Sequence, residues 1–216
     1  MPLPQLRVAG WAPIVTDDVR WICHRDAAAM RWLVENSNGD PLVLCVGPHA
    51  RHFLKQRGLD DRFVRCACTI TEEPQPGLGS TFAPDVTAQM LARAMRTAEH
   101  HALAVTETAF PIEGWAMEVH AVDIRTGETT VDTRTDEQRQ LLARLVRVLR
   151  NGWVGQLAGR MVRTYLEQLE ASGMTWAVWA GSMVALSPEN ADLDRAEPYL
   201  PASWRDEIAG HLLWGG

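Results

Sequence analysis

Cysteine and histidine, the residue types that most often bind zinc in proteins, gather in the first third of the chain. All four cysteines and three of the seven histidines lie there, namely Cys23, Cys45, Cys66, Cys68, His24, His49 and His52. Structural zinc sites use paired ligands two to four residues apart, and only Cys66 and Cys68 form a thiol pair of that kind. We therefore expect free cysteines buried in strands. A zinc site formed by Cys45, Cys66, Cys68, His49 and His52 stays open as the alternative.

A second group of residues with possible chemistry is a run of arginines without acidic neighbours. Between residues 139 and 163 the chain holds no Asp or Glu and has six arginines, Arg139, Arg144, Arg147, Arg150, Arg160 and Arg163. Arginines clustered in this way can follow a phosphate backbone, so they are candidate contacts to single-stranded nucleic acid. The alternative is a solvated helix face opposite Leu142 and Leu145, which needs charge of either sign.

The sequence lacks the common phosphate-binding and nucleophile motifs: no glycine-rich P-loop, no dinucleotide fingerprint and no nucleophile elbow. One strand-to-helix junction, at residues 46–49, is the type of place where helix N-termini attract anions. Gly47 and His49 in that junction are candidates for binding a small molecule. Trp214, near the C-terminus, is a candidate contact to the body of the protein, to a protein partner or to a second subunit of a homo-oligomer.

Composition limits the class of protein that can carry these residues. The chain has 216 residues, 46% of them hydrophobic, with four cysteines and a formal net charge of −6. These values favour a folded chain with free thiols and argue against a disulfide scaffold or an obligate DNA-coating protein. No apolar run approaches a membrane span, and the N-terminus does not resemble a signal peptide. We therefore expect a cytoplasmic protein without membrane contact.

The first 70 residues alternate between short apolar runs and amphipathic stretches. We expect strands at 19–23, 41–47 and 63–70, and helices at 26–35 and 48–57. This alternation is typical of βαβ units with parallel strands. Residues 71–84 hold three prolines and two glycines without periodicity, which predicts a linker between a βαβ region at 1–70 and an α/β domain at 85–216.

In the second part we expect a helix over 85–100 capped by Asp85, then three strands and three more helices. The expected strands are 102–108, 117–124 and 128–133, and the expected helices are 135–150, 159–171 and 203–213. The turn at Thr126-Gly127 predicts that the second and third strands form an antiparallel hairpin.

This order of elements resembles the RNase T-like, or DEDD, family of 3′–5′ exonucleases over about 85 residues, from Ala102 to Leu186. The first strand of that family ends in Asp-x-Glu-Thr, which Val105-Thr106-Glu107-Thr108 matches in part. An apolar hairpin with a Thr-Gly turn follows in the family, as in residues 118–133 here. The resemblance implies a mixed sheet of the RNase H type flanked by helices, preceded by the small βαβ region, with Glu107 as a candidate catalytic residue.

The sequence departs from the family at its catalytic aspartates. Val105 stands at the first, and Met161-Val162 stands where Phe-Asp is expected. Two-metal catalysis needs several carboxylates around Mg²⁺ or Mn²⁺, so we expect a degenerate exonuclease that binds nucleic acid or a protein and no metal. Asp192 or Asp194 lies near the family's last acidic position. The alternatives are an active enzyme with a non-standard site of Glu107, Glu118, Asp123 and Asp132, and a small-molecule-binding α/β protein.

Overall fold

The structure, a computed structural model, describes residues 5–15, 17–45, 55, 67–69, 77–108, 110–150, 156–190 and 193–212. Its strands are β1 (Val8–Ala12), β2 (Leu42–Cys45), β3 (Ala67–Thr69), β4 (Thr81–Ala83), β5 (Ala102–Thr106) and β6 (Val122–Asp123). Its helices are α1 (Val19–Glu35), α4 (Ala88–Thr97), α5 (Glu113–Val119), α6 (Asp136–Arg150), α7 (Gln156–Ala171), α8 (Trp176–Leu186) and α9 (Ala202–Leu212), with 3₁₀ turns at Pro188–Asn190 and Leu193–Tyr199. None of the helices in these ranges is long and apolar enough to cross a membrane.

The six strands form one sheet in the order β3-β2-β4-β5-β1-β6, and every pairing between them is parallel. In the centre, residues 8–12 of β1 pair with residues 102–106 of β5 over their full length. The five residues of β5 are all buried, as expected for a central strand of a parallel sheet that is covered on both faces. The expected α/β class is confirmed.

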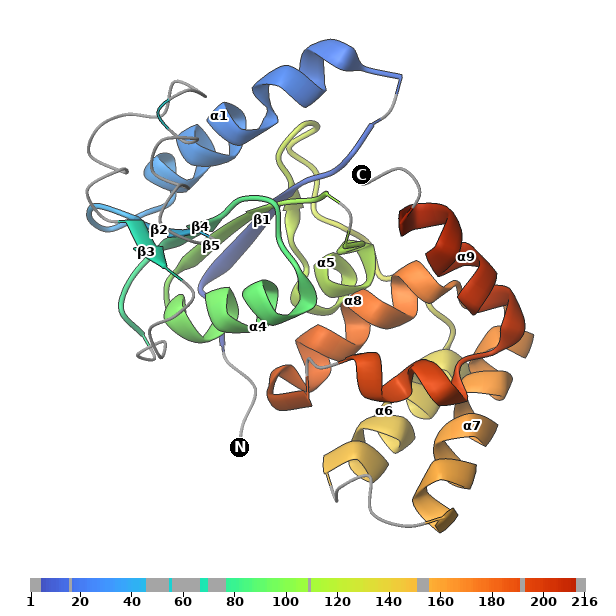
Figure 1. Cartoon of the computed structure of the whole chain (residues 1–216). Helices are drawn as coiled ribbons and strands as arrows, with labels where there is room; N and C mark the ends of the chain where they lie inside the picture. Colours follow the sequence, from blue (N-terminus) through green and yellow to red (C-terminus); the bar gives the residue numbers. More distant parts are fainter. Residues whose placement is uncertain are drawn as a thin grey trace.

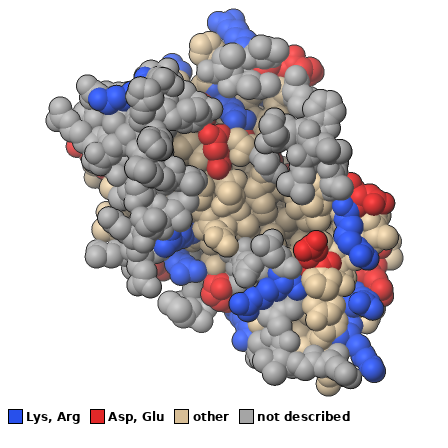
Figure 2. Space-filling view, in the orientation of Figure 1, with Lys and Arg blue, Asp and Glu red and all other residues tan. Residues whose placement is uncertain are grey.

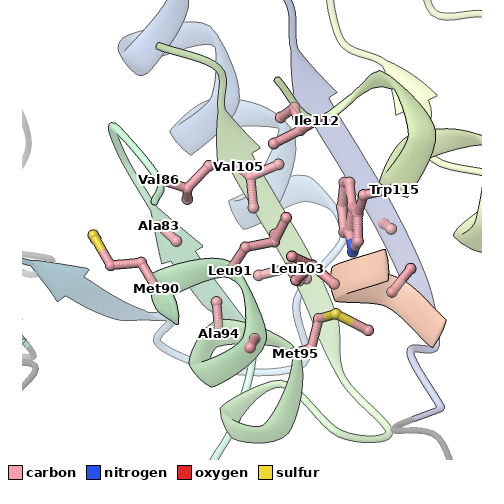
Figure 3. Close-up of a cluster of buried hydrophobic side chains, with 14 of the residues drawn as sticks. Ala83, Val86, Met90, Leu91, Ala94, Met95, Leu103, Val105, Ile112 and Trp115 are labelled. Carbon is pink, nitrogen blue, oxygen red and sulfur yellow. The ribbon is translucent and has the colours of Figure 1, made fainter. Parts of the chain in front are cut away.

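Helices cover the two faces of the sheet, with α1 on one face and α4 and α5 on the other (Figure 1). Alternate strand residues separate the two sides: Phe82, Ala102 and Ala104 pack with α1, whereas Leu103 and Val105 pack with α4 and α5. Figure 3 shows Leu91 and Met95 of α4 directed toward the β5 side chains of this second core. Trp115 of α5 is fully buried in the same core.

The helices that follow the sheet form a further hydrophobic core, separate from the two cores on the faces of the sheet. α6, α7, α8 and α9 lie beside the sheet region, to the lower right in Figure 1. Their apolar faces meet around Leu145, Leu166 and Trp179, with the rings of Trp179 and Trp204 5.5 Å apart. α8 also packs on α5, and this contact joins the helical region to the sheet.

One expectation for the first 70 residues needs correction, and three others fall in part outside the described residues. Residues 19–23, expected as a strand, begin α1, because the Asp18 side chain caps that helix by accepting from Trp21 N at 2.9 Å. The expected helix 26–35 is the remainder of α1. The strand expected at 41–47 is confirmed as β2, and β3 lies within the expected 63–70. The expected helix 48–57 lies, apart from Lys55, outside the described residues.

The expected hairpin is confirmed only around its turn: Asp123 N donates to Glu128 O and Thr130 N donates to Ala121 O, across the Thr126-Gly127 turn. Residues 113–119 form α5 instead of the start of a strand, and His120 ends that helix in the left-handed conformation with a φ of 50°. Only the two-residue β6 follows, and it pairs in parallel with β1. The expected partner strand at 128–133 makes a single antiparallel bridge, between Val122 and Thr129. The expected mixed sheet with an antiparallel hairpin is therefore replaced by a parallel sheet.

The expected linker also contains part of the core. Thr81–Ala83, within residues 71–84, form β4 in the middle of the sheet, and all three residues are buried. Strands from residues 1–70 and from residues 85–216 belong to this one sheet, so it runs across the expected boundary. The helix expected from Asp85 begins at Ala88, because the Thr87 side chain accepts from Met90 N and takes the capping role.

Candidate functional site

Three neighbouring strands, β4, β5 and β1, end at the same edge of the sheet, and polar residues follow them. Ligands of open parallel α/β sheets usually bind at this carboxyl edge, between strands whose connections leave to opposite faces. β1 continues into α1 on one face and β5 continues into α5 on the other. The junction between β1 and β5 is therefore such a switch point, and Glu107 stands at it.

Glu107 ties the loop after β1 to the start of α5. Its two carboxylate oxygens accept from Ile14 N at 2.9 Å and from Ile112 N at 3.1 Å. Its own backbone N–H donates to Ala12 O, the last residue of β1. Burial raises the pKa of the Glu107 carboxyl above its ordinary value, and the two backbone N–H donors oppose that rise. Glu107, the candidate catalytic residue, thus links the loop after β1 to the start of α5 at the carboxyl edge.

Arg25 reaches the same place from α1, with a side chain that is only 9% exposed. Its guanidinium donates to the backbone oxygen of Glu107 at 2.5 Å and to the Asp85 carboxylate at 3.4 Å. Asp26 adds a third charge, with a carboxylate oxygen 3.9 Å from Arg25 Nε. A guanidinium has five N–H donors, so Arg25 keeps donors beyond these contacts.

Asp85 follows β4 after Pro84, in a backbone conformation that residues with a side chain disfavour. Its φ is 50°, in the left-handed region, which costs a residue other than glycine roughly 1 kcal/mol. The buried Thr106 hydroxyl accepts from Asp85 N at 3.0 Å and helps to hold that geometry. The Asp85 side chain is 34% exposed, so its carboxylate is accessible to solvent while it contacts Arg25.

Together these residues make a compact set of acceptors and donors. Asp85 offers carboxylate oxygens, Arg25 offers N–H donors, and Glu107 holds the backbone around them. Figure 2 shows charged side chains of both signs around uncharged surface near the centre of this face of the molecule. Such a set can bind a ligand group that both donates and accepts hydrogen bonds.

A second polar cluster lies between α5, α8 and the chain before α6, and it is centred on Arg134. The guanidinium of Arg134 donates to both carboxylate oxygens of Asp132, at 2.7 and 2.8 Å, and also to Glu118 and to Ser182 Oγ. The Arg134 side chain is buried. The hydrogen bonds from Arg134 lower the pKa of Asp132 to about 2. All these groups satisfy one another, so this cluster fixes the chain that follows the short hairpin.

The arginines of residues 139–163 are exposed, but they do not act as one set. Arg139 pairs with Asp132 and Asp136, and Arg150 pairs with Glu189. The structure records no ion pair for the other four, Arg144, Arg147, Arg160 and Arg163, among the residues it describes. Figure 2 shows basic side chains on the part of the surface formed by these helices, with acidic ones between them.

The non-standard metal site is not formed. Glu118 and Asp132 bind Arg134, the Asp123 carboxylate accepts from Arg125 N, and Glu107 lies at the carboxyl edge. Over the described ranges there is no group of three or more His, Cys, Asp or Glu side chains that can hold a metal ion. The zinc alternative is untested, because its ligands lie outside those ranges: Cys66, His49, His52 and the side chains of Cys45 and Cys68. Three other residues named in the sequence analysis also lie outside them, Gly47, Asp192 and Trp214.

The two valines that replace the expected aspartates lie apart. Val105 is buried in the core between the sheet and α4, whereas Val162 is buried in the core of α6, α7 and α8. The alignment to the exonuclease pattern assumed that these positions face one site, and that assumption is wrong. Nothing here places a carboxylate set beside either valine.

Sequence reasoning missed Arg25 and the role of Asp85. Arg25 was placed between an expected strand and an expected helix, and Asp85 was given only a capping role. The usable signal was Phe82-Ala83-Pro84-Asp85, an apolar pair followed by a turn with an acidic residue. It was hidden because a strand of three residues inside a proline- and glycine-rich stretch is too short to show periodicity.

Comparisons of this chain with known protein families, with curated proteins and with solved structures give no match.

Proposed function

We propose that this protein binds a small polyhydroxylated molecule, such as a monosaccharide or the ribose of a nucleoside, at the carboxyl edge of β4, β5 and β1. Asp85 accepts hydrogen bonds from ligand hydroxyls, and Arg25 donates to ligand oxygens. Glu107 positions both by fixing the loop after β1 and the start of α5. The proposed function is binding.

The observation that carries the proposal is the conformation of Asp85. A left-handed backbone at a residue other than glycine is retained only when its surroundings compel it, and such residues concentrate at ligand sites. Here the strain holds an accessible carboxylate beside a buried guanidinium, at the edge of the sheet where parallel α/β proteins bind ligands.

The charge of the set favours hydroxyl groups over a phosphate. Among the residues of this set that the structure describes, Asp85 and Asp26 contribute two carboxylates and Arg25 contributes a guanidinium. A dianionic phosphate meets unfavourable repulsion in such a set, whereas a hydroxyl can donate to Asp85 and accept from Arg25 at once. Vicinal hydroxyls, as in sugars, present two such groups at a spacing that one carboxylate can bridge.

This proposal takes up the small-molecule alternative, at a different place from Gly47 and His49. The exonuclease-like alternatives have less support, because the hairpin behind the resemblance is reduced to one antiparallel bridge and the two valines lie in separate cores. Descent from an exonuclease stays a prediction that the comparisons do not test.

Thermal unfolding with and without ligand tests the proposal. D-ribose, D-glucose and adenosine are the probes, each titrated to saturation against the wild-type chain and against Asp85→Asn. Asparagine tolerates the left-handed conformation, so this change removes the charge and keeps the shape. At about 100 times the Kd, a ligand stabilises the folded state by about 2.7 kcal/mol, and we expect that gain with at least one probe in the wild type and its loss in the variant.

Asp40→Asn is the matched control, because Asp40 is an exposed aspartate just before β2, at the opposite end of the strands. It should keep the full ligand response. Equal stabilisation of wild type and Asp85→Asn, or no stabilisation by any of the three probes, contradicts the proposal.

A further inference from the structure

A groove runs between α6 and α7 on the helical side of the molecule. It has a volume of about 480 Å³ and is open to solvent. Gln140 and Arg144 line it from α6, and Gln168 and Ser172 line it from α7. The groove lies outside the carboxyl-edge site, and none of its lining residues takes part in that site.

Helical spacing extends both walls of this groove toward the junction of α6 and α7. Met161 and Leu157 precede Gln168 by seven and eleven residues on α7, so they share its stripe of the helix surface. Leu157 is 72% exposed and Met161 is 36% exposed. On the α6 side, Arg147 follows Gln140 by seven residues and shares its stripe in the same way. Beyond the lining residues, the stripe on α7 thus continues in exposed apolar side chains, and the stripe on α6 continues in a basic one.

The α6 wall of the groove carries two basic residues, Arg144 and Arg147. The structure records no ion pair for Arg144 or Arg147 in the part of the chain that it describes, whereas Arg139 and Arg150, at the two ends of the arginine run, are paired. The chain as a whole carries a net charge of −6, so this wall is a local reversal of sign. It attracts a negatively charged partner.

We propose that this groove docks an acidic amphipathic helix of a partner protein. The apolar face of that helix packs on Leu157 and Met161, and its acidic side chains pair with Arg144 and Arg147. A nucleic acid fits less well, because the arginines share the groove with exposed apolar side chains and with Glu137 at its other end. A symmetric pair of copies of this chain fits less well too, because a two-fold axis across the groove sets arginines of equal charge against each other. A two-fold axis along the groove sets them against the α7 wall, which has no carboxylate among its lining residues.

Fluorescence anisotropy with a designed peptide tests the docking. The probe is a labelled helix of about 15 residues with leucines at helical spacing on one face and glutamates on the other. Its controls are a peptide of the same composition in scrambled order and a single-stranded oligothymidine of similar length. We expect the helix to bind the full chain and the scrambled peptide to bind at least about tenfold more weakly.

Two surface variants locate the binding. Two double variants should each weaken binding of the helix by about tenfold or more. One is Leu157→Ala with Met161→Ala, and the other is Arg144→Glu with Arg147→Glu. Val131→Ala and Arg125→Glu are the matched controls, since both residues are exposed and lie outside α6 and α7, and they should leave the affinity unchanged. All the altered side chains are exposed, and circular dichroism checks that each variant keeps its helical content.

Three results overturn the proposal. The first is no binding of the helix at concentrations up to ~1 mM, or binding that the two groove variants leave unchanged. The second is tighter binding of oligothymidine than of the helix, with loss in Arg144→Glu and Arg147→Glu only, which assigns the wall to nucleic acid. The third is self-association in sedimentation that Leu157→Ala with Met161→Ala abolishes, which assigns the groove to a second copy.

Discussion

At the scale of single residues, the protonation of Glu107 links stability to pH. Burial raises its folded-state pKa above the ordinary value of 4.5, so the folded protein binds the proton more tightly than the unfolded chain does. Between those two pKa values the folded state holds more protons, and the free energy of unfolding therefore falls as pH rises through this window. Above the folded-state pKa, Glu107 is ionised in the folded protein, and the cost of burying its charge lowers the free energy of unfolding by its full amount.

We predict that Glu107→Gln removes this dependence on pH. The amide cannot ionise, but its NH₂ group faces a backbone N–H, so one of the two hydrogen bonds to Ile14 and Ile112 is lost at a cost of about 1–3 kcal/mol at every pH. Urea unfolding of wild type and variant, across a pH series that starts below 4.5, measures both effects. A variant whose pH profile runs parallel to that of the wild type contradicts this assignment.

Arg134 carries a prediction of its own, because it is a buried cation bound to two carboxylates. Arg134→Leu leaves Asp132 and Glu118 without their common partner, and we expect a loss of about 3–5 kcal/mol in the free energy of unfolding. Arg125→Leu, at an exposed position, should change it by less than about 0.5 kcal/mol. Chemical denaturation at neutral pH measures both.

The ion pair of Arg134 and Asp132 also determines how the free energy of unfolding falls at acid pH, which is the acid limb of the stability curve. The folded pKa of Asp132 is about 2 against an ordinary value of 3.8, so its contribution is present above 3.8 and is lost as pH falls toward 2. Arg134→Leu should flatten this limb. An acid limb of the same steepness in Arg134→Leu and wild type means that Arg134 is not the cause.

The sequence indicated one member of the carboxyl-edge set and concealed the others. Glu107 was found because Val105-Thr106-Glu107-Thr108 resembles the end of the first strand in the RNase T-like family. Arg25 and Asp85 were missed as site residues because their neighbours become visible only when β4 and β1 are paired with β5, which is a long-range property. Local patterns carry no information about which strands become neighbours.

At the scale of elements, the close crossing of α5 and α8 depends on Gly114. A Cβ built on Gly114 lies 1.8 Å from Val178 O, a backbone atom that cannot move without its helix. We predict that Gly114→Ala destabilises the protein by about 3 kcal/mol, because the helices must separate and the Trp115 contacts loosen. Thermal unfolding measures the loss.

Gly159→Ala is the control at this scale. The three atoms nearest to its added Cβ all belong to the Tyr199 side chain, the closest at 2.9 Å, and a side chain can turn aside. The better helix propensity of alanine, about 1 kcal/mol, offsets that contact, so we expect a change near zero. Equal losses in the two variants show that close approach of backbones is not what matters at Gly114.

Elements with a plain local signal were predicted well, and those decided by tertiary contact were not. β5, α6 and α7 follow clear apolar periodicity and appear near their expected ranges. Residues 117–124 have the composition of a strand, but packing of Trp115 and Gly114 on α8 makes the first three of these residues the end of a helix. The opening of α1 was misread because Trp21 and Ile22 suggest a strand while the Asp18 cap starts a helix.

At the scale of the whole molecule, one parallel sheet determines where a ligand can bind. The sheet joins strands from both sides of the expected linker, so the carboxyl edge is built from residues 12–14, 83–85 and 106–107 together. The helical side carries the α6–α7 groove as a separate surface. The two proposed sites therefore lie at two separate places, one at the carboxyl edge of the sheet and one between α6 and α7.

The most direct test of the carboxyl-edge site is an NMR titration of the ¹⁵N-labelled chain with the sugar or nucleoside that gives the largest thermal stabilisation. The account predicts that the amide signals of Asp85, Glu107 and Ile112 shift with one common Kd. Signals of the α6–α7 groove, such as Arg144 and Gln168, should stay in place. Shifts confined to α6 and α7, or no shifts near Asp85 at saturation, contradict the account.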